Sequence, residues 1–331
     1  MSKKIKDTDY LVISARIRAM ETGLLTGERM EQILTSRSNE EVVKLLQESG
    51  YPTMSLESPG AMDAAIATAR EETLQDLGDS APDNQYLNIF KLKYDYHNAK
   101  AILKAQAMNT DPDHMLADLG RVPAAELKEM ITGGDMNLLP PLLATAIAEA
   151  KEVLETTRDP QLGDIVLDRW MYRDEMETAE TTGSEFLRGY VRVSIDAANL
   201  RSLVRTLRMG KNAAFLEGVL VSGGTVGESE ILTVAGNNGG GLAELYASTE
   251  LKDAAQAGAD ALKVGALTKF EKLCDDAVSG YLSGAQMVAF GEAPLIGYLA
   301  ARETEYTNLR ILLMGRAAGL DPETIRARLR T

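Results

Sequence analysis

One short pattern recurs along this chain of 331 residues, and its spacing constrains the fold more than any other feature. The pattern is an acid, two variable residues, asparagine, one variable residue and a base, followed closely by paired aliphatic residues. Its three copies contain Asp95, Asn98, Lys100, Ile102 and Leu103; Asp196, Asn199, Arg201, Leu203 and Val204; and Glu305, Asn308, Arg310, Leu312 and Leu313. The asparagines are 101 and 109 residues apart, so we predict three similar units joined in one chain.

A second pattern follows two of these copies, so the duplication extends beyond one helix. The corresponding residues are Gly120, Val122, Glu126 and Leu127, and Gly224, Val226, Glu230 and Ile231. Near the start of the chain, Gly23, Leu25 and Met30 have the same offsets, and Ser14 to Ile17 resembles a degraded motif with serine in place of asparagine. The corresponding segment after the last motif, Gly319 to Ile325, is shifted by one residue. We therefore predict domains at residues 1–108, 109–210 and 211–331.

The local pattern predicts an all-α protein. Apolar residues follow a helical period, as in Leu200, Leu203, Val204 and Leu207, whereas alternating strand patterns are scarce. Clusters of glycine, proline and asparagine divide the chain into helices of about 10–20 residues. One such helix is expected to begin at Asn39, which we predict as its capping residue. Three similar helical-bundle domains are the expected architecture.

Composition excludes several classes of function. The net charge of −14 opposes binding to nucleic acid phosphates. A single cysteine, Cys274, and two histidines cannot form a disulfide or a zinc site within one chain, which favours a cytoplasmic setting. No apolar run approaches the ~20 residues that span a bilayer, and the start of the chain does not resemble a secretory signal. We expect no direct bilayer insertion, so any membrane association would be peripheral.

The motif asparagine has two possible roles. In a helix the acid and the asparagine share one face, and Asn199 lies beside Leu203, at the edge of an apolar seam. An unpaired buried amide costs about 1–3 kcal/mol, so we predict that the asparagine binds a neighbouring loop or helix end. Direct contact with a partner is the alternative.

Basic residues follow the motif along one side of two of the predicted helices: Lys100 and Lys104, then Arg201, Arg205 and Arg208. One interpretation is that they pair with acids of adjacent helices, where surface pairs contribute about 0–1 kcal/mol each. The other is that they form positive stripes on a concave face that receives a partner. The patch from Leu167 to Arg173, which includes Trp170, is a further candidate for an interface, although core packing is the stronger interpretation.

No pattern predicts a catalytic residue, a cofactor or a metal. Gly210-Lys211-Asn212 lacks the spacing and the hydroxyl of a phosphate-binding loop, and the run from Gly239 to Gly241 follows no predicted strand. Asp275 and Asp276 are weakly similar to the aspartate-rich magnesium helices of all-α enzymes, and Asp111 to His114 contains further acids. Helix-entry or solvated-surface roles explain both better, so a magnesium-dependent enzyme is the least favoured hypothesis.

The order and spacing of these motifs resemble those of the C-subunit family of the V/A-type rotary ATPases, whose eukaryotic member is called the d subunit. The stretches that carry the resemblance are residues 10–20, with the sequence Ala-Arg-Ile-Arg-Ala-Met, and residues 90–104, 167–169, 186–205 and 294–329. The last stretch is the most specific. Together they cover most of the chain.

The resemblance implies a non-catalytic protein of three similar domains in a pseudo-threefold, funnel-like arrangement. It would act as a central-stalk rotor subunit at the cytoplasmic face of the cell membrane, hold the D and F subunits of the shaft, and rest on the membrane proteolipid ring. The family has no catalytic residues to carry over. Ser14 departs from the motif, which puts its hydrogen-bonding role in question. A helical-repeat scaffold with a different partner is the second hypothesis.

Overall fold

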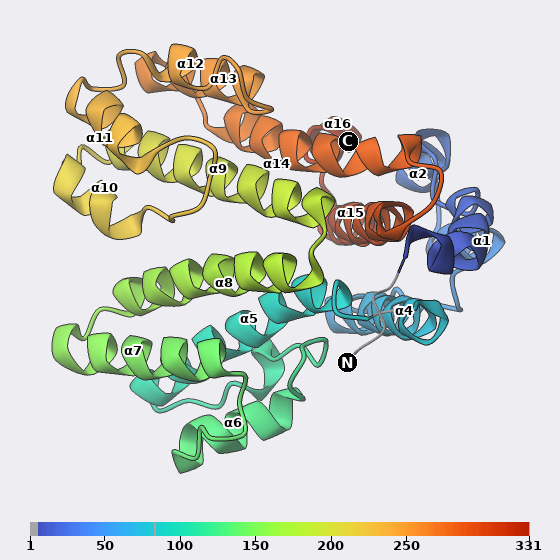
Figure 1. Ribbon diagram of the computed structural model, residues 1–331. Coiled ribbons are helices and arrows are strands. Elements are labelled where there is room, and N and C mark those ends of the chain that lie inside the picture. Colours follow the sequence, from blue (N-terminus) through green and yellow to red (C-terminus); the bar gives the residue numbers. More distant parts are fainter. Residues whose placement is uncertain (1–5, 83, 331) are drawn as a thin grey trace. The chain divides into compact units, whose positions relative to one another are not determined.

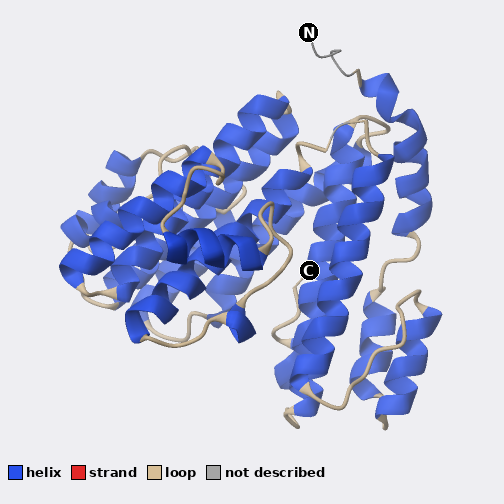
Figure 2. Cartoon of the chain, turned by 90° about the horizontal axis from the view of Figure 1, so that it is seen from below, coloured by secondary structure: helices blue, strands red, loops and turns tan. Residues whose placement is uncertain are grey.

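The protein is described here by a computed structural model that defines residues 6–82 and 84–330. Helices are the only regular elements across these residues, and Figure 2 shows them joined by loops with no strand. The all-α prediction is confirmed. In the same two ranges, no helix combines the length and the apolar character needed to cross a bilayer.

The chain forms two compact units. One unit combines the described parts of residues 1–84 and 275–331, and the other spans residues 85–274. Described segments from near the start and near the end of the sequence therefore belong to the same unit. The predicted limits of three domains, at residues 108 and 210, remain a prediction.

The first unit is built around a long helix near the C-terminus. Its elements are η1 (Asp7–Tyr10), α1 (Leu11–Glu21), α2 (Gly27–Thr35), α3 (Asn39–Glu48), α4 (Pro59–Ser80), η3 (Gly284–Met287), α15 (Glu292–Ala317) and α16 (Pro322–Arg326). Helix α15 packs against α1, α2, α4 and α16. The core joins Ile33, Leu46 and Ile66 from the start of the chain to Leu309 and Leu312 of α15.

The second unit contains two of the motif helices, α5 and α9. Its elements are α5 (Leu87–Met108), η2 (Asp113–Met115), α6 (Ala124–Gly133), α7 (Pro141–Thr157), α8 (Pro160–Thr182), α9 (Glu185–Arg208), α10 (Ala213–Val219), α11 (Glu228–Gly236), α12 (Leu242–Leu245) and α13 (Lys252–Lys263). Helix α8 lies between α7 and α9 and also packs on α5 (Figure 1). Helix α14 (Thr268–Ser283) contains the boundary between the units.

Short polar side chains fix many of the helix starts. The hydroxyl groups of Thr26, Ser58 and Ser184 each accept a hydrogen bond from an amide of the first helical turn. The prediction that Asn39 caps its helix is wrong by one residue. Ser38 has the extended backbone of a cap and accepts from the Glu41 amide, whereas Asn39 is the first residue of α3.

The three motif helices end in the same way. The chain adopts a left-handed backbone at Asn109, Gly210 and Gly319, with φ of 52°, 64° and 68°. Each of these residues lies eleven positions beyond the motif asparagine. Glycine and asparagine tolerate this conformation better than other residues, so each helix is stopped at an equivalent point.

Candidate functional site

The motif asparagine makes the same two hydrogen bonds in all three copies. In α5, Asn98 Nδ2 donates to the Ala117 carbonyl at 2.8 Å, and the Ala117 amide donates back to Asn98 Oδ1 at 2.9 Å. In α9, Asn199 exchanges the same pair of bonds with Val221, at 2.8 Å in both directions. Asn308 of α15 does so with Arg330, at 2.9 and 2.7 Å. All three asparagine side chains are buried. The two hydrogen bonds supply partners both for the buried carboxamide and for the backbone amide and carbonyl of one residue that it binds.

The motif acid holds a second point on the loop. The Asp95 carboxylate accepts from the amides of Arg121 and Val122, at 2.9 and 3.2 Å. In the second copy, Asp196 accepts from the amides of Thr225 and Val226, at 3.0 and 3.1 Å. We call the motif acid, the motif asparagine and the loop backbone that they bind the helix-loop clamp.

Glycine is required where the loop meets the motif acid. A Cβ added at Gly120 would lie 2.2 Å from Asp95 Oδ1, and one added at Gly224 would lie 2.2 Å from Asp196 Oδ1. Neither glycine has a positive φ, so space rather than backbone conformation sets the requirement. The glycine of the second sequence pattern therefore packs directly against the acid of the first pattern, because a residue without a Cβ leaves room for the carboxylate.

The third clamp is closed by both ends of the chain. Glu305 Oε2 accepts from the Leu25 amide at 2.6 Å, across 280 residues of sequence. Leu25 occupies the position of Val122 and Val226 in the second sequence pattern. Asn308 binds Arg330, which lies near the other end of the sequence. The pattern of Gly23 and Leu25 therefore completes the motif of α15 rather than that of the neighbouring Ser14.

Ser14 has a different contact. Its buried hydroxyl lies 3.5 Å from the carbonyl oxygen of Gly291, the residue immediately before α15. The degraded motif thus contributes one side-chain bond, whereas each complete motif binds backbone groups through both its acid and its asparagine. Helix α1 packs on α15 through this region.

The predicted basic residues are engaged within the chain. Lys100 pairs with Asp168, and Lys104 pairs with Asp164 at 2.5 Å. Glu271 lies between Arg201, at 3.2 Å, and Arg205, at 2.8 Å. Two further motif-helix arginines complete the set: Arg208 donates to the carbonyls of Ala261 and Gly265, and Arg310 pairs with Asp63 at 2.6 Å.

A buried ion network, which the sequence reasoning missed, supports the first clamp. The Arg121 guanidinium donates to Asp95 at 2.7 Å and to both oxygens of Asp174 on α8, at 3.0 and 2.6 Å. Tyr96 also donates to Asp174. Burial raises the pKa of Asp95, against the opposing effect of Arg121 and the loop amides. Arg121 occupies the position after the clamp glycine, but nothing in the motif spacing pointed to Asp174.

Glu175, next to Asp174, is the least satisfied acid in this region. It is 6% exposed, and its Oε2 has no hydrogen-bond partner among the described residues. Burial raises the pKa of Glu175 to about 8, with Asp174 acting in the same direction and Lys93 in the opposite one. Glu175 is therefore largely protonated at neutral pH.

The third clamp has an aromatic and cationic support of its own. Tyr51 donates to Glu305, and Arg302 pairs with the same carboxylate at 2.5 Å. The Arg302 guanidinium also lies over the rings of Tyr51 and Tyr306, 5.2 and 4.8 Å from their centroids. These contacts tie the residues after α3 to α15.

Trp170 lies at the edge of a cavity of about 630 Å³ between α8 and the loop at Val221. Its Nε1 donates to Glu149 at 2.7 Å, and the Arg173 guanidinium lies 4.7 Å from the ring centroid. The indole is half-buried, which fits a packing role with one polar edge at the surface.

Three of the acids considered as magnesium ligands pair with basic side chains of the chain. Asp275 pairs with Arg330 at 2.9 Å, and Lys128 bridges Asp111 and Asp113 at 2.9 and 2.5 Å. Across residues 6–82 and 84–330, no group of three or more His, Cys, Asp or Glu side chains could hold a metal ion.

These contacts define a helical-repeat protein in which the recurring polar residues hold loops against long helices. The ATP synthase (C/AC39) subunit family matches residues 13–328, and the chain belongs to this family. It is 25% identical to the C subunit of the V-type sodium ATPase of Enterococcus hirae, over 97% of this chain and 98% of that protein. It is also 26% identical to the C subunit of the A-type ATP synthase of Methanocaldococcus jannaschii, over 97% and 86% of the two chains.

A third relative extends the comparison. The C subunit of the A-type ATP synthase of Haloferax volcanii is 23% identical over 97% of both chains. The family match over residues 13–328 includes both Leu25 and α15, which the third clamp joins through Glu305. The resemblance to the C subunits of V/A-type ATPases is confirmed at the level of the family.

Proposed function

We propose that this chain is a non-catalytic central-stalk subunit of a V/A-type rotary ATPase. It would join the D and F subunits of the shaft to the membrane proteolipid ring and transmit torque between them, from a peripheral position at the cytoplasmic face of the membrane. The observation that carries the proposal is the family match over residues 13–328, supported by C-subunit relatives that align along nearly their whole length.

The helix-loop clamps suit this mechanical role. A subunit that transmits torque must resist bending at the joints between its helices. The first two clamps each fix one loop to a long helix at two points, and the third fixes two separate segments to α15. Because the clamp groups are buried, water does not compete for them, and a loss of either partner leaves an unsatisfied polar group. We propose that the three clamps mark three similar domains in a pseudo-threefold, funnel-like arrangement.

The five basic residues Lys100, Lys104, Arg201, Arg205 and Arg208 remain candidates for contact with the shaft. Arg205 is the most open of those that form an ion pair, with 56% of its side chain exposed. A partner carboxylate would have to compete with Glu271 for it, so such a contact would add orientation and salt dependence more than affinity.

Affinity purification from detergent-solubilised membranes of the native organism tests the assembly. A tagged copy of this chain should retain the shaft subunits, the catalytic head and the proteolipid, each identified by mass spectrometry. Recovery of a soluble complex without rotary ATPase subunits would reject the proposal and favour a scaffold with a different partner. An Arg205→Glu variant that retains the shaft with unchanged salt dependence would remove Arg205 from the contact surface without affecting the wider proposal.

A further inference from the structure

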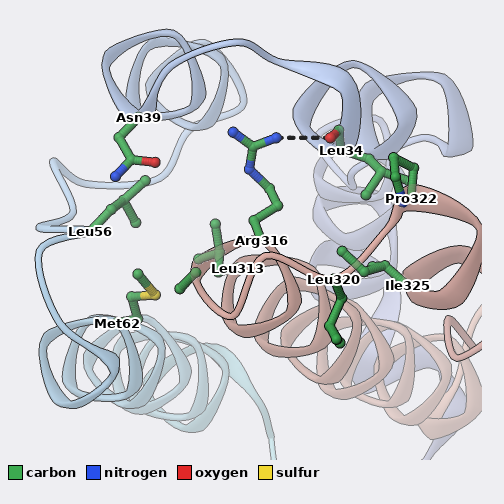
Figure 3. A pocket seen from close by; sticks show the side chains of 10 residues that line it. Leu34, Asn39, Leu56, Met62, Leu313, Arg316, Leu320, Pro322 and Ile325 are labelled. Atoms are coloured by element: carbon green, nitrogen blue, oxygen red, sulfur yellow. Dashed lines mark hydrogen bonds between the residues drawn. The ribbon is translucent and has the colours of Figure 1, made fainter.

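A cavity of about 460 Å³ opens in the first unit beside the C-terminal end of α15. Figure 3 shows Leu56 and Met62 on one side and Leu313 and Ile325 on the other. Asn39 and Arg316 are the polar side chains of the lining. We call this cavity the Arg316 pocket. Its volume falls within the range of about 300–1,000 Å³ that is typical of sites for small organic molecules.

Arg316 brings to this cavity a charge without a carboxylate partner among the described residues. Its Nη1 donates to the carbonyls of Leu34 and Ser36, at 2.8 and 2.9 Å, which fixes the half-buried guanidinium in place. Figure 3 shows the guanidinium between the Leu34 carbonyl and the side chain of Asn39. Within residues 6–82 and 84–330, no carboxylate forms an ion pair with Arg316.

Other partly buried arginines of this acidic protein do have counterions. Arg121 and Arg302, each with 14% of the side chain exposed, pair with Asp174 and Glu305. The carbonyl oxygens at Arg316 orient the guanidinium but carry no full negative charge. A ligand carboxylate bound to the remaining N–H groups of Arg316 would form charge-assisted hydrogen bonds. It would give Arg316 the kind of counterion that Arg121 and Arg302 have.

We propose that the Arg316 pocket binds a monocarboxylate with an aliphatic tail of medium length. The carboxylate would lie against the Arg316 guanidinium, with the Asn39 carboxamide as a second donor, and the tail would cover Leu56, Met62 and Leu313. One cation beside a lining in which eight of the ten residues are apolar matches a ligand with one anionic end and one apolar end. This inference concerns a ligand of the isolated chain and is independent of its assembly with other subunits.

Calorimetric titration of octanoate into the purified full-length chain tests the pocket. Octanoate should bind, whereas acetate, which lacks the tail, and 1-octanol, which lacks the charge, should each bind at least roughly tenfold more weakly. Equal binding of octanoate and 1-octanol would overturn the role of Arg316. Absence of octanoate binding would overturn the proposal as a whole.

Two variants place the binding at this pocket. Asn39→Asp puts a carboxylate at the mouth while favouring the start of α3, because acids stabilise the first turn of a helix. We expect it to weaken octanoate binding roughly tenfold, and Asn212→Asp, at the start of another helix, to leave binding unchanged. Arg316→Gln should weaken binding by a similar factor.

Arg208→Gln is the matched control for Arg316→Gln, since it removes an arginine that also binds two carbonyls at the end of a motif helix. Unchanged binding in both pocket variants would contradict the proposal, as would an equal loss in a pocket variant and its control. If the circular dichroism of Arg316→Gln shows a loss of helix, that variant has not folded properly, and octanoate binding by Asn39→Asp then tests the proposal.

Discussion

Replacing Gly120 by alanine should destabilise the second unit by far more than its small change in volume suggests. The new Cβ would lie 2.2 Å from Asp95 Oδ1, and real Cβ atoms essentially never show contacts shorter than 3.0 Å. The oxygen must therefore withdraw by at least the difference, 0.8 Å. Asp95 is fully buried, so it cannot turn toward water.

The cost follows from the bonds that this oxygen makes. Oδ1 accepts from the amides of both Arg121 and Val122, and a net hydrogen bond to a charged group is worth about 1.5–3 kcal/mol. Loss of both bonds predicts a decrease of roughly 3–6 kcal/mol in the free energy of unfolding. Because domains are stable by only about 5–15 kcal/mol, this change alone should bring the unit close to unfolding at room temperature.

Urea denaturation followed by circular dichroism measures the effect, with Gly133→Ala as the control. Gly133 is the last residue of α6, and a Cβ there meets nothing within 4 Å, so alanine should be neutral or stabilising by up to about 1 kcal/mol. In an Asp95→Ala background, Gly120→Ala should add little further cost, since the clash is with Asp95. Equal midpoints for Gly120→Ala and Gly133→Ala would refute the reasoning.

Three further predictions concern the same contacts. Asn199→Leu leaves the amide and carbonyl of buried Val221 unpaired and should cost roughly 2–4 kcal/mol in urea denaturation, and a cost below 1 kcal/mol would contradict this. Removal of residues 327–331 takes away the backbone that Asn308 binds, so amide hydrogen exchange in α15 should accelerate, and unchanged protection would argue against closure by the chain ends. The pKa of Glu175 is raised from 4.5 to about 8, so its contribution favours the folded state most at low pH and is lost as the pH rises between these values. Glu175→Gln should reduce that loss of stability, and an unaltered pH profile of the unfolding free energy would show that Glu175 titrates normally.

Much of the helical content follows directly from the sequence. The period of Leu200, Leu203 and Val204 places one face of α9 in the core, and all three side chains are buried. Helix boundaries follow less directly from the sequence. Ser38 and Asn39 are both residue types that cap helices, and only the backbone angles show that Ser38 is the cap.

The parts that the sequence did not predict depend on contacts between distant residues. Leu25 and Glu305 are 280 residues apart, so no local pattern could show that the start of the chain completes the last clamp. The sequence shows the Gly23 and Leu25 pattern, but its position along the chain associates it with nearby Ser14. Asp174 and Glu175 lie outside every repeated position, and their burial comes from the packing of α8 against α5 and α9.

The proposed role as a torque-transmitting connector is tested most directly by deleting the gene in the native organism and measuring ATP hydrolysis and ATP-driven ion transport in the same membrane vesicles. We expect ion transport to be lost, while the catalytic head still hydrolyses ATP, and both activities to be coupled again when the full-length chain is restored. Ion transport that remains fully coupled to hydrolysis in vesicles lacking this chain would contradict the account.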